Sequence, residues 1–396
     1  MTLNLNNVCR AVAACVVAAL CVAVALAARA DDPHPDGEAR DQAASEAIDV
    51  SIIAQDKGWA LDATQRHMDD QRKFGDLQDQ IEAQFPTKFS GAEFAKTPGG
   101  KSYLRFKGTV PAAAKSLATE SGLNVKLTGG RKYSAADLAQ RAVAIVTFFG
   151  DNGYQQVGAA VLANGTISVA VTGASQPGLA LPSNLKNGVQ VTFVDHDVAQ
   201  DFHTYGGAYI HSSSGQCTTG FSVESQTSSD LGVTTAAHCS GMNHYHQPQG
   251  GPAYDTFWED QHIGLSGDVE WHTTPDHSVL AEYYADPTDR REVNSVETSA
   301  AVNNTYCLYS RMQGTRTCDQ VYSTYVVMLT SSGLASDLVA MDDSNSVGGD
   351  SGGPWSYSTE AAGIVKGSLW LPFKNHDTWS KAWRFDEAID VEVLTQ

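Results

Sequence analysis

The hydrophobic positions in the first part of the chain follow the spacing of a helix. Over residues 48–85, apolar residues such as Phe74 and Ile81 recur on one helical face among many charged ones. Pro86 follows at once and cannot continue a helix, so the pattern predicts helical structure that ends before it. Residues 103–107 then alternate between apolar and polar, which favours a strand.

A second helix and a hairpin are predicted next. Residues 134–149 have helical spacing, and they begin with a serine N-cap followed by Asp137, a variant of the capping box. Residues 156–171 hold two apolar runs around Asn164-Gly165, which is a hairpin signal. We therefore expect a small α/β module in residues 31–194.

Beyond Asp201 the helical periodicity nearly disappears. Short runs of β-forming residues lie between clusters of Gly, Ser, Asn and Thr, a pattern that predicts an all-β sandwich or barrel. With a boundary near residues 203–207, the chain divides into one domain over residues 31–203 and a second over residues 204–396. The strands expected in the second domain include residues 220–223, 232–236, 322–329 and 361–365.

The N-terminus has the pattern of a secretory signal peptide. Arg10 precedes an apolar run over residues 11–28, and Ala28 and Ala30 are small residues at the positions that a signal peptidase recognises. This predicts a signal peptide in residues 1–30. The competing interpretation is a transmembrane anchor, but the run is rich in alanine and therefore only weakly hydrophobic.

The charge and the cysteines narrow the function classes. The formal net charge of −19 argues against nucleic acids and anionic membranes as partners, because both are negatively charged. Three of the seven cysteines lie in the predicted signal peptide. The even number that remains fits an oxidising destination, and it allows three pairings, of which neighbour pairing closes short loops. The remaining cysteines are Cys217, Cys239, Cys307 and Cys318.

The run Gly348-Gly349-Asp350-Ser351-Gly352-Gly353-Pro354 is typical of a nucleophile turn. A serine attacks poorly unless a base takes its proton and nearby groups stabilise the oxyanion that forms. Glycines allow a tight turn that points backbone N–H groups at one place. We expect the N–H groups of Gly349 and Ser351 to form such an oxyanion hole.

A histidine motif supplies the base. In residues 234–239, Thr-Thr-Ala-Ala-His-Cys, a β-run ends in two small residues that leave room beside the imidazole of His238. A disulfide at Cys239 would fix the loop that carries it. A zinc site is the alternative for a histidine beside a cysteine, but the other cysteines lack ligand-pair spacing.

Together, these two motifs resemble those of the chymotrypsin-like (trypsin-like) serine proteases. The segment Cys217-Thr218-Thr219-Gly220-Phe221-Ser222-Val223 is similar to the secreted bacterial branch of streptogrisin and α-lytic protease. The resemblance implies two six-stranded antiparallel β-barrels with the triad between them. It also implies an extracellular endopeptidase that cleaves polypeptides without a metal or another cofactor.

The order of the triad in this family is His, Asp, Ser, so the aspartate must lie between the two motifs. Asp268 leads into the alternating, aromatic-containing run Val269-Glu270-Trp271, as in the family, and is our candidate. Its role would be to accept the imidazole N–H and stabilise the imidazolium. The other candidates are Asp255, Asp260, Asp276, Asp286 and Asp289.

One residue departs from the family pattern. Lys366 stands where the family has a serine whose hydroxyl faces the triad aspartate. We expect either that this alignment is off by one residue or that the ammonium points to solvent.

The first domain resembles, more loosely, the pro region of the secreted bacterial proteases. This implies a self-inhibited precursor in which residues 31–203 help the second domain to fold and then cover its active site. The alternative is a stable accessory domain with its own binding role.

Two rival functions have to be weighed. Residues 349–353 also match the nucleophile elbow of α/β-hydrolases, but an esterase needs a helix after the serine, which Gly352-Gly353-Pro354 disfavours. That fold also needs an Asp or Glu and then a His after the serine, and Glu360 is the sole carboxylate between Ser351 and His376. The second rival is an inactive, protease-like binding protein. Such proteins usually lose a triad residue, and here all three are present.

Overall fold

The computed structural model describes residues 40–194, 199–201, 208–213, 215–246, 253–274, 278–371 and 374–396. The predicted signal peptide and the predicted boundary at residues 203–204 lie outside the described residues. Residues 39–396 belong to one compact unit. Of the helices in the described part, none is both long and apolar enough to cross a membrane.

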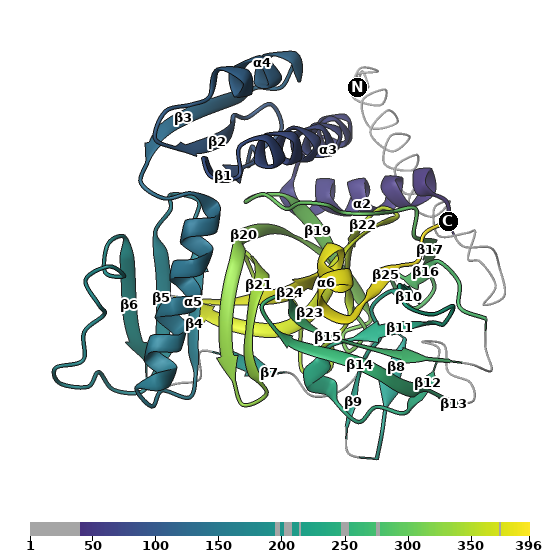
Figure 1. The fold of residues 1–396 in the computed structure, drawn as a ribbon. Helices are drawn as coiled ribbons and strands as arrows, with labels where there is room; N and C mark the ends of the chain where they lie inside the picture. Colours follow the sequence, from purple (N-terminus) through teal and green to yellow (C-terminus); the bar gives the residue numbers. More distant parts are fainter. Residues whose placement is uncertain are drawn as a thin grey trace, which may run out of the picture. The chain divides into compact units, whose positions relative to one another are not determined.

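The helical structure predicted over residues 48–85 is present as two helices, α2 (Gln42–Lys57) and α3 (Leu61–Gln84) (Figure 1). Asp41 caps α2 by accepting the Ala44 N–H, and Gly58 ends it with a left-handed φ of 67°. Glycine adopts this conformation without steric cost. The apolar spacing continues on both sides of Gly58, which is why the sequence pattern did not show the break.

A three-stranded sheet follows, in the order β1 (Phe89–Glu93), β2 (Ser102–Lys107) and β3 (Val125–Arg131), with α4 (Ala112–Glu120) in the connection between β2 and β3. The predicted strand is β2. Its buried Leu104 and Phe106 share a core with Phe74 and Ile81 of α3.

The second predicted helix is α5 (Ala135–Asp151), and the capping box is complete. The Ser134 hydroxyl accepts the Asp137 N–H, and the Asp137 carboxylate accepts the Ser134 N–H. The predicted hairpin is also present, as β4 (Val157–Val161) and β5 (Ile167–Thr172) with Gly165 at φ 81°. The strand β6 (Val189–Val194) pairs in parallel with β5.

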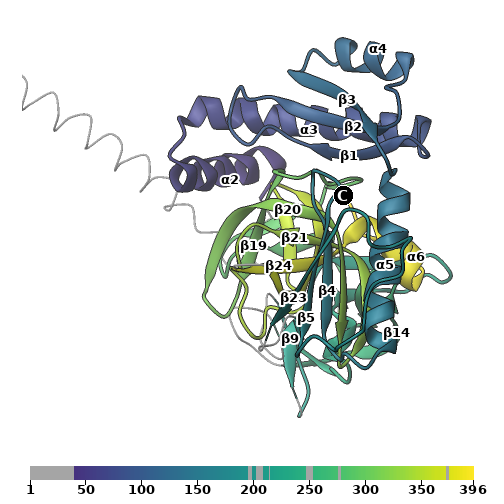
Figure 2. The same ribbon diagram turned by 90° about the vertical axis from the view of Figure 1, so that its left-hand side faces the viewer.

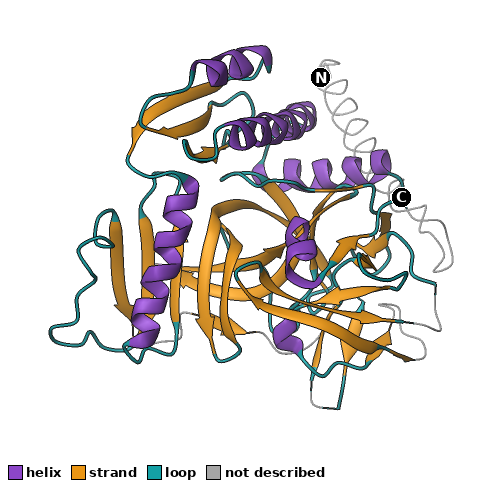
Figure 3. Cartoon of the chain, in the orientation of Figure 1, coloured by secondary structure: helices purple, strands orange, loops and turns teal. Residues whose placement is uncertain are grey.

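The rest of the chain is mostly strand, as predicted, and Figure 3 shows how few helices it contains. One sheet has five strands, in the order β14 (Phe257–Gly264), β15 (Gly267–Thr273), β11 (Leu231–Thr235), β10 (Ser222–Ser225) and β25 (Val391–Val393). A four-stranded sheet has the order β13 (Tyr254–Asp255), β12 (His244–His246), β8 (Tyr209–His211) and β9 (Gln216–Thr218), and β16 (Glu282–Tyr284) pairs with β17 (Arg290–Glu292).

The largest sheet has eleven strands and joins both halves of the sequence. Its main path is β19-β22-β23-β24-β21-β20-β4-β5-β6, and β7 and β18 pair with β23 at the side. The expected class is therefore correct, but the sheets are not two closed six-stranded barrels. The strands not yet placed are β7 (Ala199–Asp201), β18 (Ser295–Val296), β19 (Thr305–Ser310), β20 (Thr315–Thr330), β21 (Gly333–Met341), β22 (Pro354–Tyr357), β23 (Glu360–Leu371) and β24 (Lys374–Lys381).

The two halves meet where β4 pairs antiparallel with β20 (Figure 2). Ala160 lies opposite Val326, and Val157 lies opposite Leu329. Ala160 is also fully buried in a core that includes Val326 and Leu369. The strands β4 and β5, which form the predicted hairpin of the first module, thus belong to the same sheet as strands of the second domain.

Candidate active site

Ser351 lies in the turn between β21 and β22, and glycines give this turn its shape. Gly349 and Gly352 have φ angles of 114° and 84°, in the left-handed region. A Cβ on Gly352 would lie 2.2 Å from the Thr218 carbonyl oxygen, so the site requires glycine on steric grounds as well. The Thr218 N–H donates to the Ser351 carbonyl at 2.8 Å and ties the turn to β9.

His238 lies in the short 3-10 turn η1 (Ala237–Cys239) that follows β11. The two preceding alanines are buried, which leaves space for the ring as expected. A disulfide joins Cys217 to Cys239, and a second joins Cys307 to Cys318, so the cysteines have the neighbour pairing. The first disulfide fastens the histidine turn to β9, the strand to which the serine turn is also tied.

Asp268 is the second residue of β15 and is fully buried. Ser380 of β24 holds its backbone, because the Asp268 N–H donates to Ser380 Oγ at 2.9 Å and the Ser380 hydroxyl donates to the Asp268 carbonyl at 3.0 Å. Ser380 has no recognisable signal in the sequence, since nothing in the local pattern links it to a residue that precedes it by 112 positions.

The three residues expected to form the triad are brought together. His238 Nε2 lies 2.9 Å from Ser351 Oγ, and His238 Nδ1 lies 3.1 Å from Asp268 Oδ2. The other carboxylate oxygen, Oδ1, accepts the backbone N–H of His238 at 3.1 Å. This arrangement can move a proton from the hydroxyl to the imidazole while the carboxylate holds the ring in orientation.

Lys366 contradicts the expectation that its ammonium points to solvent. The side chain is fully buried, and Nζ lies 2.6 Å from Asp268 Oδ2 and 3.4 Å from His238 Nδ1. The lysine points inward because the carboxylate provides a counter-ion for a buried cation. The triad aspartate thus has a cation in place of the hydroxyl expected from the resemblance.

The surroundings of Asp268 favour its charged form. Burial alone would raise the pKa of the carboxyl, but the Lys366 ammonium and His238 bring the pKa well below its usual range. These two neighbours therefore offset the cost of burying the carboxylate as an anion.

The oxyanion hole at Gly349 and Ser351 stays a prediction. The left-handed φ of Gly349 is compatible with the required turn. The Asp350 N–H between them donates to the Val347 carbonyl at 3.0 Å, so this group is directed back into the turn.

Comparison with known proteins finds solved structures that are similar to this chain. No family model matches the chain, and no curated protein matches it. A structure described as a glutamic acid specific serine protease, with a histidine triad in substrate binding, has 20% sequence identity and a TM-score of 0.41, over 48% of this chain and 100% of that one. Protease A of Thermobifida fusca has 20% identity and a TM-score of 0.40, over 48% and 98% of the two chains. A homologue of α-lytic protease has 18% identity and a TM-score of 0.39, over 48% and 97%.

Proposed function

We propose that this protein is a secreted serine endopeptidase with the chymotrypsin-like arrangement of its catalytic domain. The observation that carries the proposal is the buried chain of hydrogen bonds from Asp268 through His238 to Ser351. The three residues come from separate elements, and His238 and Ser351 lie 113 positions apart. A purely structural role would not require this order of carboxylate, imidazole and hydroxyl.

In the proposed reaction, His238 Nε2 takes the proton of the Ser351 hydroxyl as Oγ attacks the carbonyl carbon of the scissile bond. The tetrahedral oxyanion accepts hydrogen bonds from the N–H groups of Gly349 and Ser351. The imidazolium then gives its proton to the leaving amine, which leaves an acyl-enzyme on Ser351. A water molecule, deprotonated by His238, releases the second product and restores the serine.

Residues 31–203 would form the pro region of a self-inhibited precursor. In support of this, β7 pairs antiparallel with Gly367–Leu369 of β23, directly after Lys366. A segment from the end of the first domain thus occupies the edge of a strand that leads to the candidate triad. Pairing to an exposed strand edge is a common way for proteins to hold an extended peptide.

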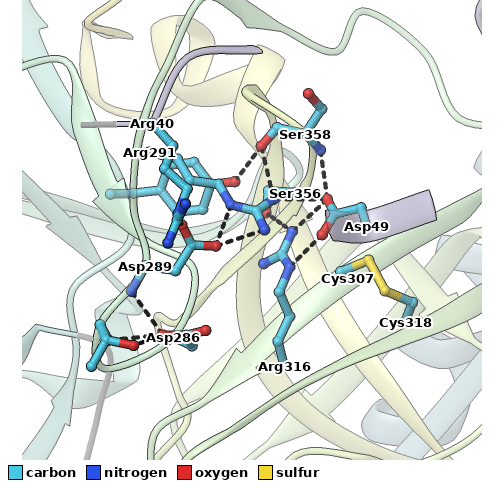
Figure 4. A network of polar contacts seen from close by, with 12 residues as sticks. Arg40, Asp49, Asp286, Asp289, Arg291, Cys307, Arg316, Cys318, Ser356 and Ser358 are labelled. Atoms are coloured by element: carbon cyan, nitrogen blue, oxygen red, sulfur yellow. Dashed lines mark hydrogen bonds and ion pairs between the residues drawn. A yellow bond between two sulfur atoms is a disulfide. The ribbon is translucent and has the colours of Figure 1, made fainter. Parts of the chain in front are cut away.

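The helices of the first domain also contact the second domain through buried polar groups, and Figure 4 shows the group around Asp49 of α2. Asp49 of α2 is fully buried and accepts hydrogen bonds from Arg291 Nη1 at 2.9 Å and Arg316 Nε at 2.8 Å. Its Oδ2 also accepts the Ser358 N–H at 2.7 Å. In α3, Gln71 accepts the Thr305 N–H at 2.8 Å. These contacts and the β4–β20 pairing support a role for residues 31–203 as a template for folding.

Covalent labelling tests the proposed activity. A fluorophosphonate probe should label the protein secreted from cells that express the full chain, and Ser351→Ala should remove the label. Ser331→Ala, in the exposed turn between β20 and β21, is the matched control and should be labelled like the wild type. An unlabelled but folded wild-type protein would favour the inactive binding protein instead.

A further inference from the structure

One face of the four-stranded sheet gathers three histidines, called here the histidine cluster. The strands β8 and β12 pair antiparallel, and His211 lies opposite His244 (Figure 1). His246 is two positions beyond His244, so both side chains lie on the same face of β12. The ring of His211 contacts both, with centroids 5.3 Å from His244 and 5.0 Å from His246. The proposed catalytic reaction uses none of these three imidazoles.

The state of His211 suits a metal ligand. Its Nε2 is buried and has no hydrogen-bond partner among the described residues. Burial, followed by the neighbouring His246 and His244, lowers the pKa of His211, so the ring is neutral at neutral pH. A neutral imidazole is the form that binds a metal. A buried nitrogen without a partner also costs free energy, which a bound ion would offset.

A carboxylate reaches the cluster from the strand on the other side of β12. There β13 places Asp255 opposite His244, and Nδ1 of His244 lies 3.0 Å from Oδ1 of Asp255. In metal sites, a carboxylate in this position commonly fixes the ring and leaves its other nitrogen for the metal. Asp255, one of the triad candidates from the sequence, therefore lies beside this cluster. The side chain of His244 is 38% exposed, so an ion can enter from solvent.

Three histidines from two adjacent strands match a common set of zinc ligands. Imidazole nitrogens suit Zn²⁺, and three of them with an open fourth position form an established type of site. In the structure, the rings lie against one another, and their nitrogens do not all lie within 4.8 Å of one another. Binding therefore requires rotation about the Cα–Cβ and Cβ–Cγ bonds, which the partial exposure of all three side chains permits.

We propose that the histidine cluster binds a Zn²⁺ ion, with Asp255 as the partner that orients His244. This goes beyond the proposed function, which needs no metal. The ion would join β8 to β12 across one face of the sheet. On the other face, Ile210 of β8 packs with the disulfide-bonded Cys217 and Cys239. The ion would therefore stabilise the sheet that supports the turn η1.

Zinc titration of the full chain tests the site. The protein is secreted without a histidine tag and with Ser351→Ala, which keeps the precursor intact if maturation is self-catalysed. After removal of metal with a chelator, calorimetric titration with ZnCl₂ should show one ion bound per molecule. The ion should also raise the thermal midpoint, because it binds the folded state. His211→Ala and His246→Ala should each abolish both effects.

Two further variants sharpen the test. Asp255→Asn should weaken zinc binding by about ten- to a hundredfold, as the loss of an outer partner does. Because Asp255 is 70% exposed, this variant keeps the experiment informative even if the histidine variants do not fold. His262→Gln on β14 is the matched control, since it changes a partly exposed histidine outside the cluster and should leave the affinity unchanged.

Absence of zinc binding in the folded parent chain would overturn the inference, whatever the variants do. Equal affinity in the parent and in the folded variants of the cluster would place the ion elsewhere and overturn it too. The rings would then form only an aromatic stack with Tyr209, over whose ring Arg311 lies at 4.6 Å. Each of these outcomes leaves the fluorophosphonate test of Ser351 unaffected, so the two proposals can fail separately.

Discussion

The cluster around Asp268 and the cluster around Asp49 both hold a fully buried carboxylate between cationic or hydrogen-bonding side chains. In the first cluster, every side chain comes from the part of the chain after residue 204. In the second, Asp49 comes from α2, whereas Arg291 and Arg316 come from the strands β17 and β20. Cleavage between the domains would leave the first cluster intact and separate the second. A buried carboxylate with cationic partners therefore occurs both within the proposed catalytic domain and between it and the proposed pro region.

The largest expected effect concerns the first cluster. Ser351→Ala should lower peptide hydrolysis by about a millionfold, because the nucleophile of the triad is lost. The variant should also accumulate as an unprocessed precursor if maturation is self-catalysed. Hydrolysis of a casein substrate and the mass of the secreted protein measure both effects, with Ser331→Ala as the control. Near-normal hydrolysis by Ser351→Ala would exclude this serine as the nucleophile.

Removal of the whole first domain should prevent efficient folding of the second. The triad and the strand pairs join distant segments, and such topologies fold slowly while apolar surface is exposed. The fragment over residues 204–396 should recover activity on refolding only when residues 31–203 are added as a separate chain. Inhibition that lasts until the added module is degraded would support its second role. Equal recovery with and without the module would indicate an accessory domain.

A single substitution in the second cluster should weaken the contact between the domains. Asp49→Asn removes the carboxylate that the buried Arg316 pairs with and leaves Arg291 paired with Asp289 alone, at a cost of roughly 3–5 kcal/mol. The urea midpoint of the precursor, kept intact by Ser351→Ala, measures this loss. Asp56→Asn is the matched control because Asp56 is an exposed aspartate on the same helix. A similar urea midpoint for both variants would show that Asp49 contributes little to the stability of the precursor.

The smallest expected effect is a loss of stability of the precursor at acidic pH. Burial alone would raise the pKa of Asp49, but Arg316 and Arg291 lower it to about 2. The unfolded chain binds this proton near pH 4, roughly the ordinary aspartate value, whereas the folded precursor binds it only at lower pH. The stabilisation is thus complete above about pH 4 and is lost as the pH falls through about 2. Between about pH 4 and about pH 2, the free energy of unfolding from urea titrations should fall less steeply for Asp49→Asn than for the precursor with Asp49. Equal slopes for the two proteins would contradict the lowered pKa of Asp49.

Features with a local signal could be predicted from the sequence. The capping box at Ser134 and the hairpin around Gly165 depend on residues that are close in sequence. The grouping of His238, Asp268 and Ser351 could be predicted because each motif specifies its own turn and because a family resemblance supplies the rest.

Features that depend on distant partners could not be predicted. Nothing near Asp49 indicates that two arginines more than 200 positions away will neutralise it. The pairing of β4 with β20 likewise depends on a match of registers between separate domains. The direction of Lys366 was misjudged because a lysine is normally exposed, and only the position of Asp268 reverses that preference.

The pairing of β4 with β20 would have a consequence if the proposed pro region is cleaved off and released. The outer border of β20 would then present unpaired N–H and C=O groups along the apolar stretch Val326, Val327, Met328 and Leu329. Such a border can recruit a strand from another molecule and so start aggregation. The register between β20 and β21 is irregular at three places, including the step from Val326 to Met328. Irregularities of this kind bend and twist a strand. The exposed border should therefore be a poor template for strands of other molecules.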